Sequence, residues 1–121
     1  MEARYEIDRS KGIVLAIMAG ECTLDVRKAI WTEYSQDPDV DGLNILIDMR
    51  DCAYTLSPDE VREERRHMAQ FSKLDGRKIA IIVGRDLQYG MNRLAASVLE
   101  GPDVEARPFR DYDEALDWVL S

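Results

Sequence analysis

The sequence has little of what builds disulfide frameworks, metal knuckles or membrane spans. Only two cysteines and one histidine occur among its 121 residues. Cys22 and Cys52 are too few and too widely spaced for a framework or a Cys-x-x-Cys site, so we expect two reduced thiols and no metal. The longest apolar run, residues 13–19, is far too short to cross a bilayer. The N-terminus lacks the apolar stretch of a signal peptide, and we therefore expect a cytoplasmic protein without membrane insertion.

Positive charges are outnumbered by negative ones. There are 16 Lys and Arg residues against 24 Asp and Glu residues, which gives a formal net charge of −8 at pH 7. Phosphate backbones and anionic lipid head groups repel a protein this acidic, and no basic stripe overrides the mean charge. Nucleic acid is therefore not an expected partner. The G-x-G-x-x-G and P-loop motifs of nucleotide-binding proteins are absent too.

What the sequence does contain is the composition and pattern of one soluble α/β domain over residues 1–121. Hydrophobic residues make up 45% and charged residues 33%, a balance typical of globular proteins. Apolar and β-branched runs predict five strands, at residues 4–8, 12–19, 43–47, 78–83 and 104–109. Helical spacing predicts four helices. The first runs from Thr23 to about Gln36, the second from Ser57 to about Phe71, and the third from Leu87 or Gln88 to about Leu99. The fourth begins at Asp111.

Several helix starts carry capping signals. Thr23 is expected to cap the first helix. Ser57 with Glu60 forms a capping box, and the proline between them suits the first helical position. Asp111 with Glu114 forms a second box.

The order of these elements predicts a single mixed sheet. A short turn at residues 10–12 makes the first two strands an antiparallel hairpin, and the helices between the later strands make parallel crossovers. We therefore expect an α/β fold in which four helices pack against a five-stranded sheet. The predicted core contains Val14, Ala16, Ile45, Ile47, Ile79, Ile81, Val83, Leu94 and Val98.

Four local phrases cover nearly the whole chain. They are GIVLAIMAGECTLD, LNILIDMRDCAYTLSPDEV, KIAIIVGRDLQYGMNRLAA and FRDYDEALDWVL. The most specific pieces are the strand ending in Ile47-Asp48, the Tyr89-Gly90 step with Arg93, and the ending from Phe109 to Trp118. Together they resemble the SpoIIAA-like family, small bacterial domains related in fold to the anti-sigma-factor antagonist (STAS) domains and to CRAL-TRIO lipid-exchange domains. The resemblance implies this fold, a bacterial cytosolic setting and no assigned biochemical role.

One feature departs from the anti-sigma antagonists. Those proteins carry an Asp-Ser-Ser-Gly phrase just after the third strand, with a serine that is phosphorylated. Here the corresponding residues 51–58 read DCAYTLSP. Ser57 sits at a comparable helix start, where any helix favours a cap. The resemblance therefore does not carry a phosphorylation switch over to this chain.

Polar side chains follow the ends of two predicted parallel strands. Ligands of open α/β sheets bind beyond the carboxyl ends of the strands. We expect the two loops to be neighbours, with Arg93 one turn beyond Tyr89 on the same helical face. The candidate ligand- or partner-binding site contains Asp48, Arg50, Asp51, Tyr54 and Ser57 after one strand, and Gly84, Arg85, Asp86, Tyr89 and Arg93 after the next.

These residues also have ordinary structural explanations. Asp48 is interpreted first as a carboxylate that caps backbone N–H groups of its own loop or pairs with Arg50 or Arg85. Tyr89 and Arg93 are interpreted as a surface aromatic ring with a cation above it.

The first predicted helix carries a tryptophan that the helical pattern leaves out of the core. Val26, Ala29, Ile30 and Tyr34 form the predicted buried stripe. Trp31 lies about 140° from Val26 on the helix, so it falls off this stripe. It is either an anchor for a partner or a rim residue at the sheet edge. The first alternative, with the few apolar groups of the second helix, predicts a homodimer formed through an apolar patch.

Two classes of function remain open. The first is a non-enzymatic binding or regulatory module for a protein partner or a small apolar, lipid-like ligand. The family resemblance favours it, and no Ser-His-Asp or Cys-His arrangement is apparent, since the single histidine, His67, is interpreted as part of a solvated helix face. The second is a small enzyme that uses Asp48 or Asp86 near Arg85, which requires a raised carboxyl pKa. We expect the module, without a cofactor and without catalysis by Asp48.

Overall fold

The structure is a computed structural model of the chain, and it describes residues 3–53, 56–71, 74–84 and 104–121. Five strands, three α-helices and one short 3₁₀ helix lie within these residues. In chain order they are β1 (Ala3–Asp8), β2 (Ile13–Met18), α1 (Leu24–Ser35), η1 (Pro38–Val40), β3 (Asn44–Asp48), α2 (Pro58–Met68), β4 (Arg77–Ile82), β5 (Val104–Phe109) and α4 (Tyr112–Leu120).

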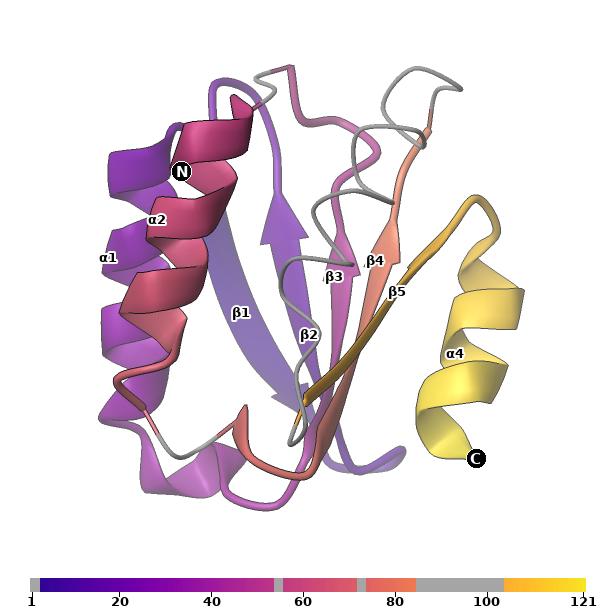
Figure 1. Cartoon of the computed structure of the whole chain (residues 1–121). Coiled ribbons are helices and arrows are strands. Elements are labelled where there is room, and N and C mark those ends of the chain that lie inside the picture. The colour runs from indigo at the N-terminus through magenta and orange to yellow at the C-terminus, as the bar shows by residue number, and fades with distance from the viewer. Residues whose placement is uncertain (1–2, 54–55, 72–73, 85–103) are drawn as a thin grey trace.

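The strands form one mixed sheet in the order β1-β2-β3-β4-β5 (Figure 1). β1 pairs with β2 antiparallel, and every later pair is parallel. The hairpin turn is held by Asp8, whose Oδ1 accepts hydrogen bonds from the backbone N–H groups of Ser10 and Lys11. Gly12 then adopts a φ of 69°, a conformation that glycine adopts without steric cost. The predicted hairpin and the parallel pairing of the later strands are confirmed.

One face of the sheet is covered by α1 and α2 (Figure 1). Strand register aligns Val14, Ile45 and Ile79 across this face, and Ala16, Ile47 and Ile81 one step further. All six side chains are buried in one apolar cluster, together with Val83. These seven predicted core positions are confirmed, whereas Leu94 and Val98 lie outside the described residues.

The opposite face is covered by α4 (Figure 1). Leu46, Ala80 and Ile82 point to this side and pack in a second, smaller cluster with Ala115 and Val119 of α4. The strands β3 and β4 therefore carry apolar side chains on both faces, which explains their near-continuous hydrophobic runs.

The helix count differs from the prediction. Three α-helices are described in place of four, because the helix expected from Leu87 or Gln88 to Leu99 lies outside the described residues. The capping box of Ser57 and Glu60 is present in full. Asp111 accepts from the backbone N–H of Glu114 at 3.1 Å.

Two local predictions about the first two helices are confirmed only in part. Thr23 occupies the N-cap position of α1, but its side chain makes no capping hydrogen bond. Helix α2 ends at Met68 and not at Phe71. A short turn follows the helix, in which the N–H of Phe71 donates to the carbonyl of Met68.

Candidate functional site

The loop after β3 is organised by the last residue of the strand, Asp48. Its Oδ1 accepts hydrogen bonds from the backbone N–H of Arg50 at 3.1 Å and from the side-chain Nε of Arg50 at 3.0 Å. Its Oδ2 accepts a hydrogen bond from Nη2 of Arg50 at 2.7 Å. The N–H of Cys52 closes the turn on the carbonyl of Met49. One carboxylate therefore both ends the strand and fixes the Arg50 guanidinium. The structural explanation offered for Asp48, capping and pairing within its own loop, is confirmed.

The hydrogen bonds from Arg50 also set the ionisation of Asp48. They lower the pKa of the carboxyl below its usual value, although partial burial opposes the effect. A carboxyl that donates a proton near neutral pH needs the opposite shift. Asp48 is therefore held as a carboxylate, and its chemistry is that of a fixed anion beside a fixed cation.

The ends of β3 and β4 lie side by side, as predicted. The N–H of Met49 donates to the carbonyl of Ile82 at 2.9 Å. A Cβ added at Gly84 would lie 3.4 Å from the carbonyl oxygen of Arg50, an ordinary van der Waals contact, which shows that the two loops are neighbours. The guanidinium carbon of Arg50 also lies 5.8 Å from the ring centroid of Tyr112, a residue at the start of α4 that the sequence did not indicate.

The end of β2 joins the same edge of the sheet. Gly20 pairs with Cys52 in an isolated parallel bridge. Its N–H donates to the carbonyl of Asp51 at 2.9 Å, and its carbonyl accepts from the N–H of Ala53 at 2.8 Å. The edge formed by residues 48–52 with Gly20, Gly84 and Tyr112 is here called the β3 edge.

The structure describes only part of the predicted site. Asp48, Arg50 and Gly84 meet at the β3 edge, and Asp51 is exposed there. Ser57 is exposed at the start of α2, and its Oγ accepts from the N–H of Glu60 at 3.2 Å. The other members, Tyr54, Arg85, Asp86, Tyr89 and Arg93, lie outside the described residues.

The prediction that Trp31 falls off the buried stripe of α1 is wrong. Only 5% of its surface is exposed, and its Nε1 donates to Oε2 of Glu64 at 3.3 Å. The buried residues of α1 are Arg27, Ile30, Trp31 and Tyr34, because the helix packs against α2 as well as against the sheet. The predicted homodimer relied on an exposed Trp31, and the burial of Trp31 removes that support.

A buried ion pair that was not predicted from the sequence joins α1 and α2. Arg27 and Glu64 are 8% and 5% exposed, and Nε of Arg27 lies 3.3 Å from Oε2 of Glu64. Nη2 of Arg27 contacts the sulfur of Met49 at 3.4 Å. Glu64 thus supplies the counter-charge that a buried arginine requires and accepts a hydrogen bond from Trp31, although Nε of Arg27 itself makes no hydrogen bond within the described residues. The signal in the sequence was its spacing, since Glu64 lies between Val61 and Met68 on one helical stripe.

His67 belongs to the same helix contact and not to a solvated face as predicted. It is half-buried, and its Nε2 lies 3.0 Å from Oγ1 of Thr32 and 3.1 Å from the carbonyl oxygen of Lys28. Its ring packs edge to face on Phe71. Within the described residues, no group of three or more potential ligands is arranged to hold a metal ion.

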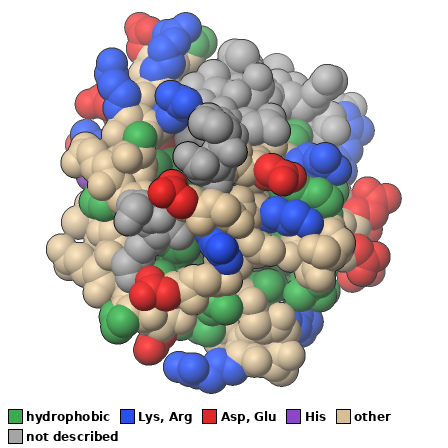
Figure 2. Space-filling view, turned by 60° about the horizontal axis from the view of Figure 1, so that its bottom comes forward, with side chains coloured by type: hydrophobic (Ala, Val, Ile, Leu, Met, Phe, Trp, Pro, Cys, Tyr) green, Lys and Arg blue, Asp and Glu red, His purple; other side chains and the backbone are tan. Residues whose placement is uncertain are grey.

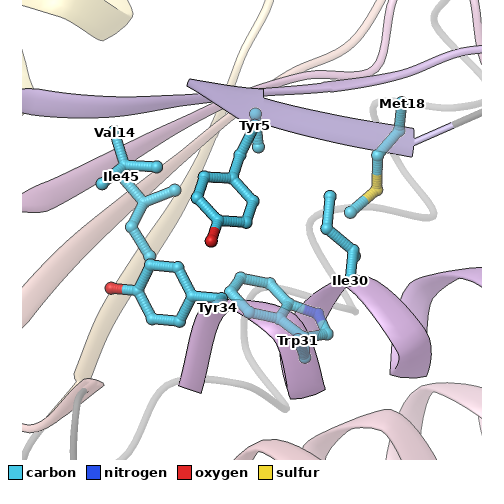
Figure 3. Close-up of a pocket in the computed structure, with 8 residues that line it drawn as sticks. Tyr5, Val14, Met18, Ile30, Trp31, Tyr34 and Ile45 are labelled. Carbon is cyan, nitrogen blue, oxygen red and sulfur yellow. The ribbon is translucent and has the colours of Figure 1, made fainter. Parts of the chain in front are cut away.

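A small cavity lies between α1 and the sheet (Figure 3). Its volume is about 10 Å³, and its lining includes Tyr5, Ile30, Trp31 and Tyr34. A space of this size is at the limit for one water molecule. The Tyr34 hydroxyl is buried without a hydrogen-bond partner in the described part of the chain, and burial raises its pKa to about 12. The cavity has no room for a lipid-like ligand.

None of the helices in the described ranges is long and apolar enough to span a membrane. Neither a protein-family model nor a curated protein sequence matches the chain.

One solved structure that resembles the chain is an uncharacterised protein of the DUF3478 family, with a SpoIIAA-like fold, from Shewanella loihica PV-4. The two chains are 20% identical, the TM-score is 0.64, and the match covers 97% of this chain and 93% of the other. At this identity the likeness establishes the fold. The chain has a SpoIIAA-like fold, and the resemblance read from the sequence is confirmed at that level.

Proposed function

We propose that the chain is a non-enzymatic binding module, similar in kind to STAS domains, that engages a protein partner through the β3 edge. The observation that carries this proposal is the closed pair of Asp48 and Arg50. Both carboxylate oxygens accept hydrogen bonds from one guanidinium, so the two side chains are held in a fixed geometry. The binding of a partner needs such a fixed surface, whereas acid–base chemistry needs a group that changes its protonation.

The alternative of a small enzyme has less support. Its proposed acid or base, Asp48, has a lowered pKa, which makes it a weak base and leaves it unprotonated at neutral pH. The histidine that usually serves such chemistry is engaged between α1 and α2. The remaining candidate pair, Asp86 and Arg85, lies outside the described residues.

The β3 edge presents a preorganised cation to a partner. Arg50 retains 46% of its side-chain exposure while Asp48 fixes its position, and the ring of Tyr112 lies beneath it. Arginine is enriched among residues that dominate binding energies. Because less side-chain freedom is lost on binding, a fixed arginine binds better than a free one. The expected partner is a protein segment that offers a carboxylate or carbonyl acceptor to Arg50.

The test is a partner-binding comparison among three proteins. The immobilised native chain captures a partner from a lysate of its source cells, and calorimetry then measures the purified partner against the native chain, Arg50→Ala and Arg9→Ala. Arg9 is an exposed arginine in the β1–β2 turn, at the opposite end of the sheet. Arg50→Ala is expected to weaken binding at least about tenfold, with Arg9→Ala unchanged. Equal binding by all three proteins would contradict the β3 edge as the interface.

A turnover assay tests the non-enzymatic part of the proposal. Any reaction found for the native chain that Asp48→Asn abolishes, while the folded structure persists by circular dichroism, would show that the chain is an enzyme.

A further inference from the structure

Helix α2 uses three of its four carboxylates in contacts with its own N-terminus or with α1. The carboxylates on its inner side are engaged by α1, because Glu63 pairs with Lys28 at 3.4 Å and Glu64 with Arg27 at 3.3 Å. Glu60 accepts from the N–H of Ser57 in the capping box. The fourth carboxylate of the helix, Asp59, is exposed and lies on the outer side with Arg62.

The outer side of α2 carries three exposed arginines, Arg62, Arg65 and Arg66, here called the arginine face. Arg62 pairs with Asp59 at 2.7 Å. Arg65 and Arg66 have no ion pair within the described residues. Arg62 and Arg66 are four residues apart, so two like charges stand on one helical face, an arrangement that is unfavourable for an isolated helix. The arginine face is not apparent from the net negative charge of the whole sequence.

Helix α4 has the opposite charge on its outer side. Asp113, Glu114 and Asp117 are exposed, here called the acidic face, and none of them has an ion pair within the described ranges. The helix dipole favours Asp113 and Glu114, which lie in the first turn. It disfavours Asp117, which lies near the C-terminal end, and the last turn holds no basic residue. Next to it, Leu120 is 48% exposed.

The two faces match in spacing. When α2 of one copy lies parallel to α4 of another, the arginines of α2 lie opposite the carboxylates of α4. An apolar contact between Ala69 and Leu120 follows at the C-terminal ends. Both sets of positions have the ordinary spacing of one helical face, four and then three residues. They are Arg62, Arg66 and the C-cap residue Ala69 of α2, and Asp113, Asp117 and Leu120 of α4.

From this complementarity we propose that the chain self-associates head to tail, with the arginine face of one copy against the acidic face of the next. The two helices cover opposite faces of the sheet (Figure 1), so two copies related by a two-fold axis cannot make both contacts at once. Such an interface builds assemblies larger than a dimer, which are open chains of copies or closed rings. The inference is independent of the β3 edge.

The contact is expected to be weak. Exposed ion pairs contribute little individually, and two copies of net charge −8 repel each other. At physiological salt, screening over about 8 Å reduces that long-range repulsion more than it reduces attraction at contact distance. Figure 2 shows acidic and basic side chains interspersed across the visible face, so the net charge does not act as one uniform negative field.

Charge-swapped variants test the proposal by sedimentation equilibrium in about 0.15 M salt. The first variant is Arg62→Glu with Arg66→Glu, the second is Asp113→Arg with Asp117→Arg, and the third combines all four changes. The combined variant keeps the native net charge of −8, which separates complementarity from net charge. The matched control, Arg4→Glu with Arg9→Glu, makes the same change of net charge as the first variant at exposed arginines away from both helices.

The native chain is expected to exceed 13.9 kDa increasingly with concentration, without a plateau at the dimer. The first and second variants should stay monomeric alone and associate when mixed, and the combined variant should associate as the native chain does. The control should retain an association constant at least about tenfold above that of the first variant.

Several results would overturn the proposal. They are a native chain that stays at 13.9 kDa up to about millimolar concentration, a first variant that associates as well as the native chain, and a folded combined variant that stays monomeric. A monomeric chain whose arginine face binds a different, acidic protein would also overturn it. If a swapped variant fails to fold by circular dichroism, Arg66→Ala and Asp117→Ala replace it, and each should weaken association at least about threefold.

Discussion

At the end of β3, the carboxylate of Asp48 has both oxygens engaged by Arg50. Its pKa is lower in the folded chain than the usual 3.8, so its ionised form stabilises the fold. This contribution is complete above about pH 4 and is lost as the pH falls through the lower folded pKa. We expect Asp48→Asn to cost about 1–2 kcal/mol at neutral pH and to flatten the loss of stability below pH 4.

Urea unfolding over a pH series measures both effects. The control is Asp51→Asn, because Asp51 is exposed in the same loop and its side chain makes no hydrogen bond within the described residues. Identical acid limbs for the two variants would show that the Asp48 pair does not stabilise the fold.

A larger loss of stability is expected from the removal of Glu64, because this carboxylate is buried. Its removal in Glu64→Ala leaves Arg27 without its counter-charge in the core and Trp31 without its acceptor. An uncompensated buried charge costs about 3–5 kcal/mol, and we expect a loss of that size in urea unfolding followed by tryptophan fluorescence. Glu64→Gln should cost less, because its amide oxygen still accepts from Trp31.

The matched control for this prediction is Glu63→Ala, which removes the partly exposed pair with Lys28 and should cost less than about 1 kcal/mol. Equal losses at positions 63 and 64 would contradict the buried pair.

These residues show what sequence reasoning can reach at this scale. The role of Asp48 followed from its place at the end of an apolar strand. Trp31 was misplaced because a helical wheel assumes one buried stripe, and α1 is buried against two neighbours. Burial of Arg27 depends on the position of α2, which no local pattern of α1 contains.

At the scale of elements, the start of α2 allows a clean test of capping. Ser57 accepts from the N–H of Glu60 at 3.2 Å, and Glu60 accepts from the N–H of Ser57 at 3.0 Å. Ser57→Ala should cost about 1 kcal/mol of unfolding free energy, whereas Ser57→Asp should keep nearly native stability, since aspartate caps as well as serine. Denaturant unfolding compares the two. A large loss in Ser57→Asp would mean that the hydroxyl has a further role.

The elements themselves were largely predictable. Apolar runs bounded by glycines or charges located all five strands within one or two residues, and their order gave the parallel and antiparallel pairs. Capping residues located the starts of α2 and α4 for the same physical reason that makes them caps. The end of α2 was harder, because the apolar pair Ala69 and Phe71 continues the pattern after the helical hydrogen bonds have stopped.

At the scale of the whole molecule, the described residues cover the two faces of the sheet unequally. The α1–α2 side contains a large buried cluster, whereas the α4 side has a small one. Asn44 links α4 to the sheet, because its Nδ2 donates to the carbonyl of Val119 at 2.8 Å and its Oδ1 accepts from the N–H of Lys78 at 2.9 Å. Lys78 in turn donates to the carbonyl and hydroxyl of Ser121.

Such an arrangement predicts that α4 opens before the rest of the fold. In native-state hydrogen exchange at low protein concentration, the amides of α4 should exchange at a lower opening free energy than those of β3 and β4. Asn44→Ala should lower the α4 value by a further 1–3 kcal/mol or so, about the cost of leaving buried polar groups unpaired, and change the strands less. Ser57→Ala controls for a general loss of stability, because it acts at α2 on the other face. If both variants lower the protection of α4 and of the strands equally, then α4 unfolds only with the whole molecule.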